Sequence, residues 1–221
     1  MKPDYAENFS LYTQSGSRKY LNAAECRCAL AAMAELAPDQ ALFAFTLAWT
    51  GARVSEVLAL TSSSFQSECG TVAIRTLKRR KHSMREVPIP PELMAALDRH
   101  FALSTVRRDP RDADHRLWPW SRTTAWRVIK RVMHASGIVG RRACPRGLRH
   151  AFGVGSLQAS IPLNLVQRWL GHARISTTAI YASASGPEEL TFARRLWATQ
   201  CCLGGGVEGR RARKWQPTPP A

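Results

Sequence analysis

One stretch of the chain, GTVAIRTLKRRKHSMREVPIP (residues 70–90), has the alternation of apolar and polar residues that paired strands require. Val72, Ile74 and Thr76 fall on one side of its first half, and Val87 and Ile89 fall on one side of its second half. Such alternation on both sides of a polar turn predicts an antiparallel β-hairpin, here with a Lys/Arg-rich tip. The rest of the chain has helical patterns. The predicted fold is therefore mainly α with a small β-hairpin or three-stranded sheet, of the α+β class.

The helical patterns carry ordinary start and stop residues. Asn22 is placed to cap a first helix, Pro38 separates that helix from a second one, and Gly51 ends the second. Short or later helices are expected at 53–60, 91–101 and 121–136, in three pieces between 148 and 181, and from Pro187 onward. Residues 104–119 are predicted to form a polar surface loop. Trp118, Trp120 and Trp126 are assigned to the core rather than to base stacking.

The charge of the chain favours a polyanionic partner. Among 221 residues, 32 Lys and Arg stand against 16 Asp and Glu, which gives a net charge of +16. Nucleic acid fits this excess better than a membrane, because the longest apolar runs, such as ALFAFTLAW (41–49), are far shorter than the roughly 20 residues that span a bilayer. The N-terminus has no apolar signal region. We therefore expect an intracellular, cytoplasmic protein.

The six cysteines do not predict a metal site. Cys26 and Cys28 are one residue apart and Cys201 and Cys202 are adjacent, which is not the spacing of zinc ligands. A reducing compartment also disfavours disulfides. We expect ordinary thiols, no metal and no cofactor.

Three basic residues are placed to form an anion-binding pocket. Arg53 in TGARVSE and Arg149 in GLRHAF each lie where a helix is expected to begin, and His172 follows Gly171 between two helices. Helix N-termini favour anions, and two guanidinium groups can clamp the oxygens of one phosphodiester. A histidine beside them could donate a further hydrogen bond to a phosphorane-like transition state.

TGARVSE, GLRHAF, LGHARISTTAIY (170–181) and the hairpin lysines, in this order, resemble the tyrosine recombinase (phage integrase) family. The resemblance covers the catalytic domain and extends to YLNAAE (20–25). It implies the tyrosine recombinase catalytic-domain fold over residues 20–200, after an N-terminal extension (1–19) and before a basic, Pro-rich, disordered tail (201–221). It also implies a site-specific recombinase or integrase that cuts and rejoins duplex DNA.

The resemblance assigns roles to individual residues. Tyr181 matches the nucleophile, which forms a 3′-phosphotyrosyl intermediate without ATP or metal. Arg53 and Arg149 match the phosphate-binding arginines, His172 matches the histidine of the LGH motif, and Glu56 matches a buried supporting acid. Lys78 is the preferred general acid on the hairpin, with Lys81 as the alternative. The remaining basic residues of the hairpin tip, which are Arg79, Arg80 and Lys81, are assigned to DNA binding.

Two features depart from the family pattern. Arg146 occupies the usual His or Lys position three residues before Arg149, and a guanidinium has no acceptor with which to act as a base. Only about 20 residues precede YLNAAE, where the family commonly has a helical domain of roughly one hundred residues, the size of a small domain, that closes a clamp on DNA. A second recombinase could supply that clamp. His150 is expected to have a structural role.

Two other functions stay open: a catalytically impaired DNA-binding remnant or regulator of the same family, and DNA relaxation of the type IB topoisomerase kind. The family works as a tetramer on two duplexes, with exchange of a C-terminal segment between copies. The predicted last helix, EELTFARRLWATQ (188–200), is the candidate for that contact, with Phe192, Leu196 and Trp197 as its apolar side. Packing of this helix on its own domain is the alternative.

Overall fold

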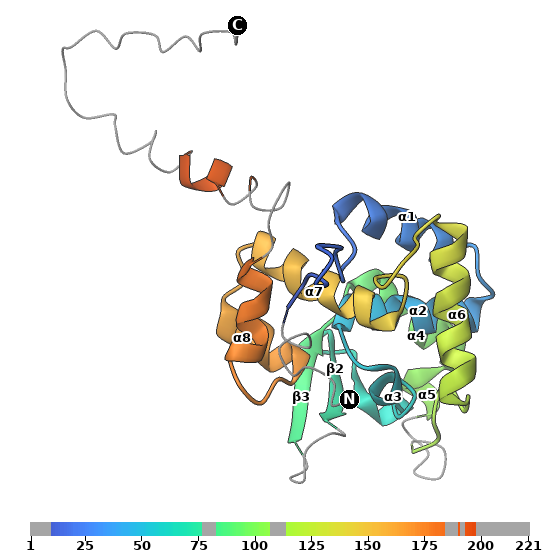
Figure 1. The fold of residues 1–221 in the computed structure, drawn as a ribbon. Coiled ribbons are helices and arrows are strands. Elements are labelled where there is room, and N and C mark those ends of the chain that lie inside the picture. The colour runs from blue at the N-terminus through green and yellow to red at the C-terminus, as the bar shows by residue number, and fades with distance from the viewer. Residues whose placement is uncertain (1–9, 77–82, 107–113, 184–189, 191–192, 198–221) are drawn as a thin grey trace, which may run out of the picture. The chain divides into compact units, whose positions relative to one another are not determined.

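A computed structural model describes residues 10–76, 83–106, 114–183, 190 and 193–197 (Figure 1). The chain divides into two compact units, residues 1–184 and 185–221. Lys78, Arg79, Arg80 and Lys81, together with Phe192 and the tail from residue 198, lie outside the described residues.

The first unit is mostly helical. Its α-helices are α1 (Ala23–Ala34), α2 (Pro38–Thr50), α3 (Val54–Val57), α4 (Pro91–Phe101), α5 (Leu103–Val106), α6 (Arg122–Ala135), α7 (Pro145–Gln158), α8 (Leu163–Leu170) and α9 (Ser176–Ala179). The described residues of this unit also form two 3-10 turns, η2 (Ser62–Ser64) and η3 (Ile180–Ser183). In the second unit, residue 190 and residues 193–197 are helical.

The predicted helix ends follow their local signals. Asn22 caps α1 in a reciprocal capping box: its side chain accepts from the Glu25 amide, and the Glu25 carboxylate accepts from the Asn22 amide. Gly51 ends α2 with a positive φ of 60°, and a side chain there would also collide with Phe152 and Leu170. Glycine at 51 is therefore required both by the backbone and by the packing of α7 and α8 on this corner.

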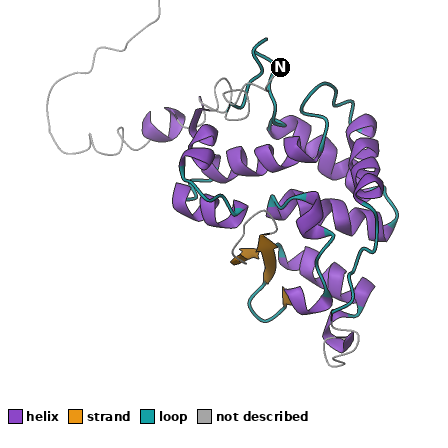
Figure 2. Ribbon diagram, turned by 60° about the horizontal axis from the view of Figure 1, so that its bottom comes forward, coloured by secondary structure: helices purple, strands orange, loops and turns teal. Residues whose placement is uncertain are grey.

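The predicted hairpin is confirmed and gains a short third strand. The strands β1 (Phe65–Gln66), β2 (Thr71–Thr76) and β3 (Ser83–Pro88) form one antiparallel sheet in the order β1-β2-β3. Val72 pairs with Val87 and Ile74 pairs with Arg85. Figure 2 shows these strands as one small sheet beside the helices, which confirms a mainly α fold with a small sheet.

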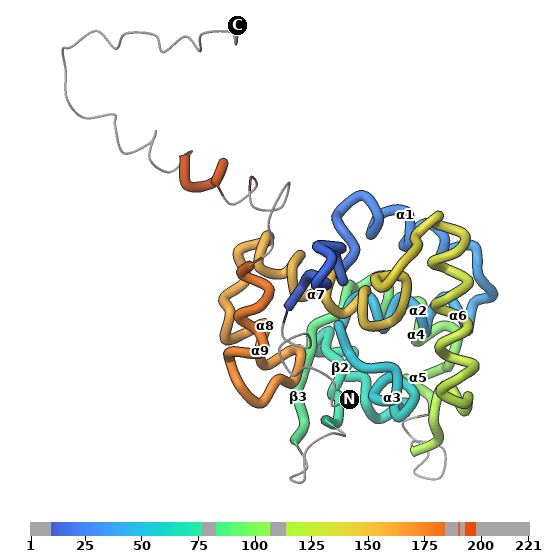
Figure 3. Tube along the Cα trace, viewed as in Figure 1, coloured from blue at the N-terminus to red at the C-terminus, as the bar shows by residue number. Residues whose placement is uncertain are grey.

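The buried side chains among the described residues of the first unit form two hydrophobic clusters. The larger one joins α1, α2, α4 and α6 to the inner face of the sheet, with Phe43, Ile74 and Trp118 among its members. The smaller one lies around the second half of α7 and includes Leu11, Val154, Leu170 and Tyr181. The helix α8 contacts β3 and is followed by α9 (Figure 3), so the C-terminal part of the unit returns to the hairpin.

Three of the local predictions were wrong. The third helix, predicted over 53–60, is the shorter α3, because Leu58 and Leu60 turn into the core instead of continuing the helix. The predicted loop at 104–119 begins within α5, and its far end buries Trp118. Trp126 is not a core residue: it is 46% exposed on α6. In the parts of the chain that are described, no helix has the length and apolar character needed to cross a membrane.

Candidate active site

Arg149 is the most deeply buried cation of the predicted site. It lies within α7, at the fifth residue rather than at the helix entry as predicted. Its Nη1 donates to the carbonyl of Gly51 at 2.6 Å and its Nη2 donates to the carbonyl of Leu170 at 2.7 Å. These carbonyls belong to the C-terminal ends of α2 and α8, where the helix dipoles favour a positive charge. Burial, followed by the charge of Arg53, lowers the pKa of Arg149 to about 10, so it stays protonated at neutral pH.

Glu56 holds Arg53 at the start of α3. Its carboxylate accepts from the amide of Arg53 at 2.9 Å, from Nη1 of Arg53 at 2.8 Å and from Nη2 of Arg85 at 2.7 Å. Burial acts to raise the pKa of Glu56, but the charges and hydrogen bonds of Arg85 and Arg53 together outweigh it and lower the pKa overall. The ionised carboxylate therefore fixes Arg53, whose side chain remains 29% exposed.

Arg85 ties this network to the sheet and to α8. Its Nε donates to the carbonyl of Trp169 at 2.6 Å, and its Nη1 donates to Oγ1 of Thr76 at 3.0 Å. The residues predicted from the sequence did not include Arg85. The sequence did contain a signal for Arg85. In the alternating stretch it is two residues from Val87 and four from Ile89, so its side chain is expected on the same inward face of the strand. A charged residue at an inward position indicates a buried partner.

Tyr181 is packed inside the smaller cluster and is 1% exposed. It lies in η3, with its ring against Gly153 of α7, where a Cβ in place of a glycine hydrogen would come within 2.6 Å of the ring. Its hydroxyl lies 3.3 Å from Nδ1 of His150. Burial raises the pKa of Tyr181, while the charges of Arg149 and Arg53 oppose that rise.

His172 stacks beside this tyrosine. The two ring centroids are 6.2 Å apart and the planes differ by 14°. Nδ1 of His172 lies 3.0 Å from Oγ1 of Thr178, and the His172 carbonyl accepts from Nε2 of Gln167 at 3.2 Å. Burial and then the charge of Arg149 lower the pKa of His172 to about 3, so its ring is neutral at neutral pH.

The structure thus brings five sequence-predicted residues into one region: Arg53, Glu56, Arg149, His172 and Tyr181. Lys78 cannot be placed relative to them, because it lies outside the described residues. Besides Arg85, sequence reasoning missed two contacts: Thr178 with His172, and His150 with Tyr181. Neither contact has a local signal, since each depends on how α7, α8 and α9 fold together. No group of three or more His, Cys, Asp or Glu placed to hold a metal ion occurs among the residues with described positions.

Arg146 lies outside this buried group and is exposed in the first turn of α7. It lines a pocket of about 390 Å³ together with Lys19, Arg122 and Arg141. His150 and Trp126 also line this basic pocket, and no acidic residue does so among the described part of the chain. Four cations without a lining carboxylate favour an anion.

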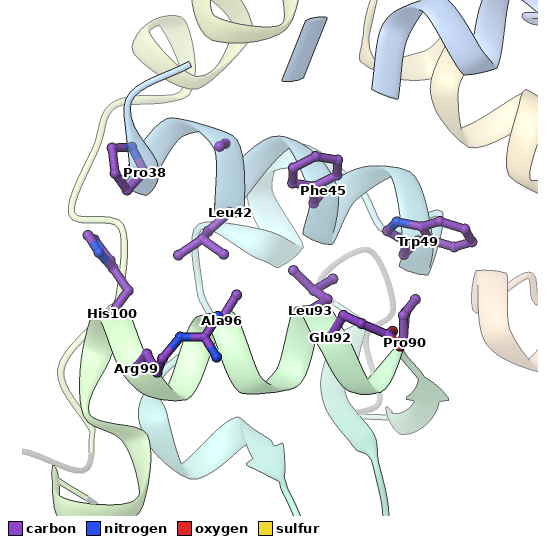
Figure 4. A pocket seen from close by; sticks show the side chains of 11 residues that line it. Pro38, Leu42, Phe45, Trp49, Pro90, Glu92, Leu93, Ala96, Arg99 and His100 are labelled. Atoms are coloured by element: carbon purple, nitrogen blue, oxygen red, sulfur yellow. The ribbon is translucent and has the colours of Figure 1, made fainter. Parts of the chain in front are cut away.

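A larger groove, of about 610 Å³, is apolar and lies elsewhere, between α2 and α4 (Figure 4). Leu42, Phe45 and Trp49 line it from α2, and Leu93 and Ala96 line it from α4. None of the predicted site residues lines this groove. Its chemistry suits an apolar side chain rather than a phosphate.

Comparisons with known proteins identify the family of this chain. The model of the phage integrase family matches residues 19–186. Tyrosine recombinase XerA of Pyrococcus furiosus is 30% identical over 170 residues, which cover 74% of this chain and 57% of that protein. Tyrosine recombinase XerD of Yersinia pestis is 32% identical over 138 residues, which cover 60% of this chain and 45% of that protein. The chain spans about half the length of these relatives.

Solved structures share the fold. A crystal structure of XerA recombinase superposes with a TM-score of 0.65 at 24% identity, covering 82% of this chain and 64% of the other. The catalytic domain of bacteriophage HP1 integrase superposes with a TM-score of 0.56 at 22% identity, covering 80% of this chain and 93% of the other. The fold is that of tyrosine recombinase catalytic domains, and the chain belongs to the phage integrase family.

Proposed function

We propose that this protein is a site-specific DNA recombinase that cleaves and rejoins duplex DNA through a 3′-phosphotyrosyl intermediate. The observation that carries the proposal is the position of Tyr181, whose ring stacks on His172 while Arg53 and Arg149 lie close enough to act on its pKa. A phenol is a poor nucleophile near neutral pH, and adjacent cations favour its ionised form. The relatives named tyrosine recombinase and the net charge of +16 support the same conclusion.

In the proposed reaction, Arg53 and Arg149 bind the scissile phosphate. Two N–H groups of Arg149 donate to backbone carbonyls, and the other N–H groups of its guanidinium can donate to a phosphate oxygen. His172, held by Thr178, donates a hydrogen bond to the same phosphate. The phenolic proton of Tyr181 passes to a neighbouring acceptor as Oη forms a bond to phosphorus. The bond from phosphorus to the 5′ oxygen breaks, and Lys78 gives a proton to the departing oxygen. The reverse reaction with another 5′-hydroxyl rejoins the strand.

The hydroxyl of Tyr181 has to become accessible before it can reach a phosphate, because the residue is almost fully buried. The segment that carries it, α9 and η3, consists of two single short turns. Short turns of this kind can shift without unfolding the larger helices. We therefore infer that DNA binding shifts this segment enough to bring the Tyr181 hydroxyl to the phosphate while its contact with His150 is kept.

We assign Arg146 to phosphate binding. It cannot accept the proton of Tyr181, and its place in the basic pocket beside Lys19 and Arg141 suits the DNA backbone. We also assign Arg79, Arg80 and Lys81 to contacts with the DNA.

We further propose that the active form is a homotetramer on two DNA sites in the cytoplasm, on the nucleoid, with exchange of C-terminal helices between copies. Leu196 and Trp197 are 56% and 51% exposed in the second unit, so both are available to contact an apolar surface of another copy. The apolar groove between α2 and α4 of a second copy fits such side chains (Figure 4). A second recombinase that supplies a clamp domain would act in the same assembly.

The test is covalent trapping on DNA. Purified protein is mixed with a pool of nicked duplexes of random sequence, whose cleaved end diffuses away, and adducts that survive denaturation are isolated. We expect an adduct for the wild type and for Tyr20→Phe, a second buried tyrosine, and no adduct for Tyr181→Phe. DNA binding without any wild-type adduct would identify the impaired remnant or regulator. Relaxation of supercoiled DNA by a monomer, without dependence on sequence, would identify the topoisomerase-like activity.

A further inference from the structure

His150 is the imidazole in hydrogen-bond contact with the Tyr181 hydroxyl. Its Nδ1 lies 3.3 Å from Oη, and the two rings pack with centroids 5.8 Å apart at an angle of 57°. The next residue toward the N-terminus is Arg149, so the helix that places the phosphate-binding arginine also places this imidazole. The position where the family resemblance expects a group able to share a proton holds Arg146, which has no acceptor.

His150 also faces the basic pocket. The pocket places Lys19, Arg141 and Arg146 around this imidazole, and Arg122 completes its rim. A phosphate of the DNA backbone is the anion that such a pocket fits in a DNA-acting protein. One side chain therefore contacts the nucleophile and also lines a site for the substrate's charge.

We propose that His150 accepts the proton of the Tyr181 hydroxyl during DNA cleavage, and that a DNA phosphate in the basic pocket activates it to do so. This inference rests on the proposed strand-transfer function. It differs from the sequence-based expectation of a structural role for His150, because that expectation had no information on the contact with Tyr181.

The charges around His150 explain why DNA would activate it. Burial, then the charges of Arg149, Arg146 and Lys19, lower the pKa of His150 to about 4. Without DNA the ring is therefore neutral and able to accept a hydrogen bond. A phosphate in the pocket that pairs with Arg146 and Lys19 cancels part of their repulsion, so the pKa of His150 rises when DNA binds. His172 also lies near His150, but the pKa of His172 is lowered to about 3, so its ring adds no positive charge at neutral pH.

The proton is conserved through the reaction. On cleavage it passes from Oη of Tyr181 to His150, while Oη bonds to phosphorus and the 5′ oxygen leaves with a proton from Lys78. On rejoining, the incoming 5′-hydroxyl gives its proton to Lys78, phosphorus releases Oη, and His150 returns its proton to the phenolate. Neither an oxidant nor a metal enters this balance.

His150→Asn and His150→Ala distinguish proton transfer from positioning. The asparagine amide oxygen can accept a hydrogen bond near the place of Nδ1 but cannot take the proton. With a trapped nicked duplex as substrate, we expect both variants to cleave about 10²- to 10⁴-fold more slowly than the wild type, the usual contribution of a general base. Added imidazole should restore part of the rate of His150→Ala. The matched control is His134→Asn, an exposed histidine on α6, which should cleave at the wild-type rate.

A second measurement follows the imidazole itself. Nitrogen NMR of Tyr181→Phe protein, which cannot cleave, reports the protonation midpoint of His150 with and without a random-sequence duplex. We expect the midpoint to rise by about a unit or more when DNA is added, the size of a typical single charge effect on a pKa. A midpoint that stays constant or falls overturns the activation by DNA.

The outcomes separate this inference from the proposed function. If the wild type forms no adduct, strand transfer fails and the role of His150 fails with it. If the wild type cleaves and His150→Asn cleaves equally fast, only the proton transfer is overturned, and His150 is a positioning residue. If His150→Ala cleaves faster than the wild type, the contact holds Tyr181 in its buried place, which also overturns the proposal. Circular dichroism checks that each variant is folded.

Discussion

Replacing Glu56 by glutamine tests the buried ion network that holds Arg53. The carboxylate is fully buried and accepts from Arg85 at 2.7 Å, while the Arg85 side chain is only 3% exposed. Glutamine has nearly the same shape, but it removes the negative charge and turns an N–H donor toward guanidinium donors. The buried charge of Arg85 would then lose the carboxylate that balances it.

The expected loss follows from this burial. Removing one partner of a buried ion pair costs about 3–5 kcal/mol in unfolding free energy. The contact to the partly exposed Arg53 adds little, since exposed pairs contribute about 0–1 kcal/mol. At a urea dependence of about 2 kcal/mol per molar, the unfolding midpoint should fall by about 1.5–2.5 M.

Urea unfolding followed by tryptophan fluorescence measures this shift. The matched control is Glu86→Gln, an exposed acid next to Arg85 on β3, which should change stability by less than about 0.5 kcal/mol. A loss below about 1 kcal/mol for Glu56→Gln would mean that the network behaves like a surface pair, and the assigned role of burial would be wrong.

The difference in stability between the wild type and Glu56→Gln should depend on pH. The pKa of Glu56 in the folded state lies below its ordinary value of 4.5, so its ionisation stabilises the fold above that pH. This stabilisation is lost as the pH falls through the lowered folded-state pKa. The stability difference between wild type and Glu56→Gln should therefore be constant above pH 4.5 and shrink below it. A difference that grows on acidification would contradict the assignment.

Three further changes test other contacts. Gly153→Ala would drive a methyl group into the Tyr181 ring, so stability should fall by about 1–3 kcal/mol and chemical nitration of Tyr181 should increase; unchanged nitration would argue against the contact. Thr178→Val removes the hydroxyl partner of His172 and should cost about 1–3 kcal/mol by urea unfolding, with slower adduct formation. Arg146→Gln should reduce the salt dependence of binding to a random duplex by about one unit of slope in fluorescence anisotropy, and an unchanged slope would exclude a phosphate contact.

Local structure could be predicted well because its causes are local. The capping box at Asn22, the proline at the start of α4 and the glycine that ends α2 each act within one turn of the chain. The hairpin followed from alternation alone. Errors occurred where tertiary packing decides the outcome: α3 is cut short by core contacts, and Trp126 points to solvent from a helix whose other face is buried.

The amino-acid order alone specifies which chemical groups the chain has: the ordered arginines, the histidine after Gly171, the terminal tyrosine of LGHARISTTAIY and a strongly basic charge. What each group touches depends on the tertiary structure. Arg85 reaches a carbonyl 84 residues away, and His150 reaches a hydroxyl 31 residues away. Such contacts depend on the relative placement of helices and strands, which results from burying the whole apolar surface at once and leaves no pattern among neighbouring residues.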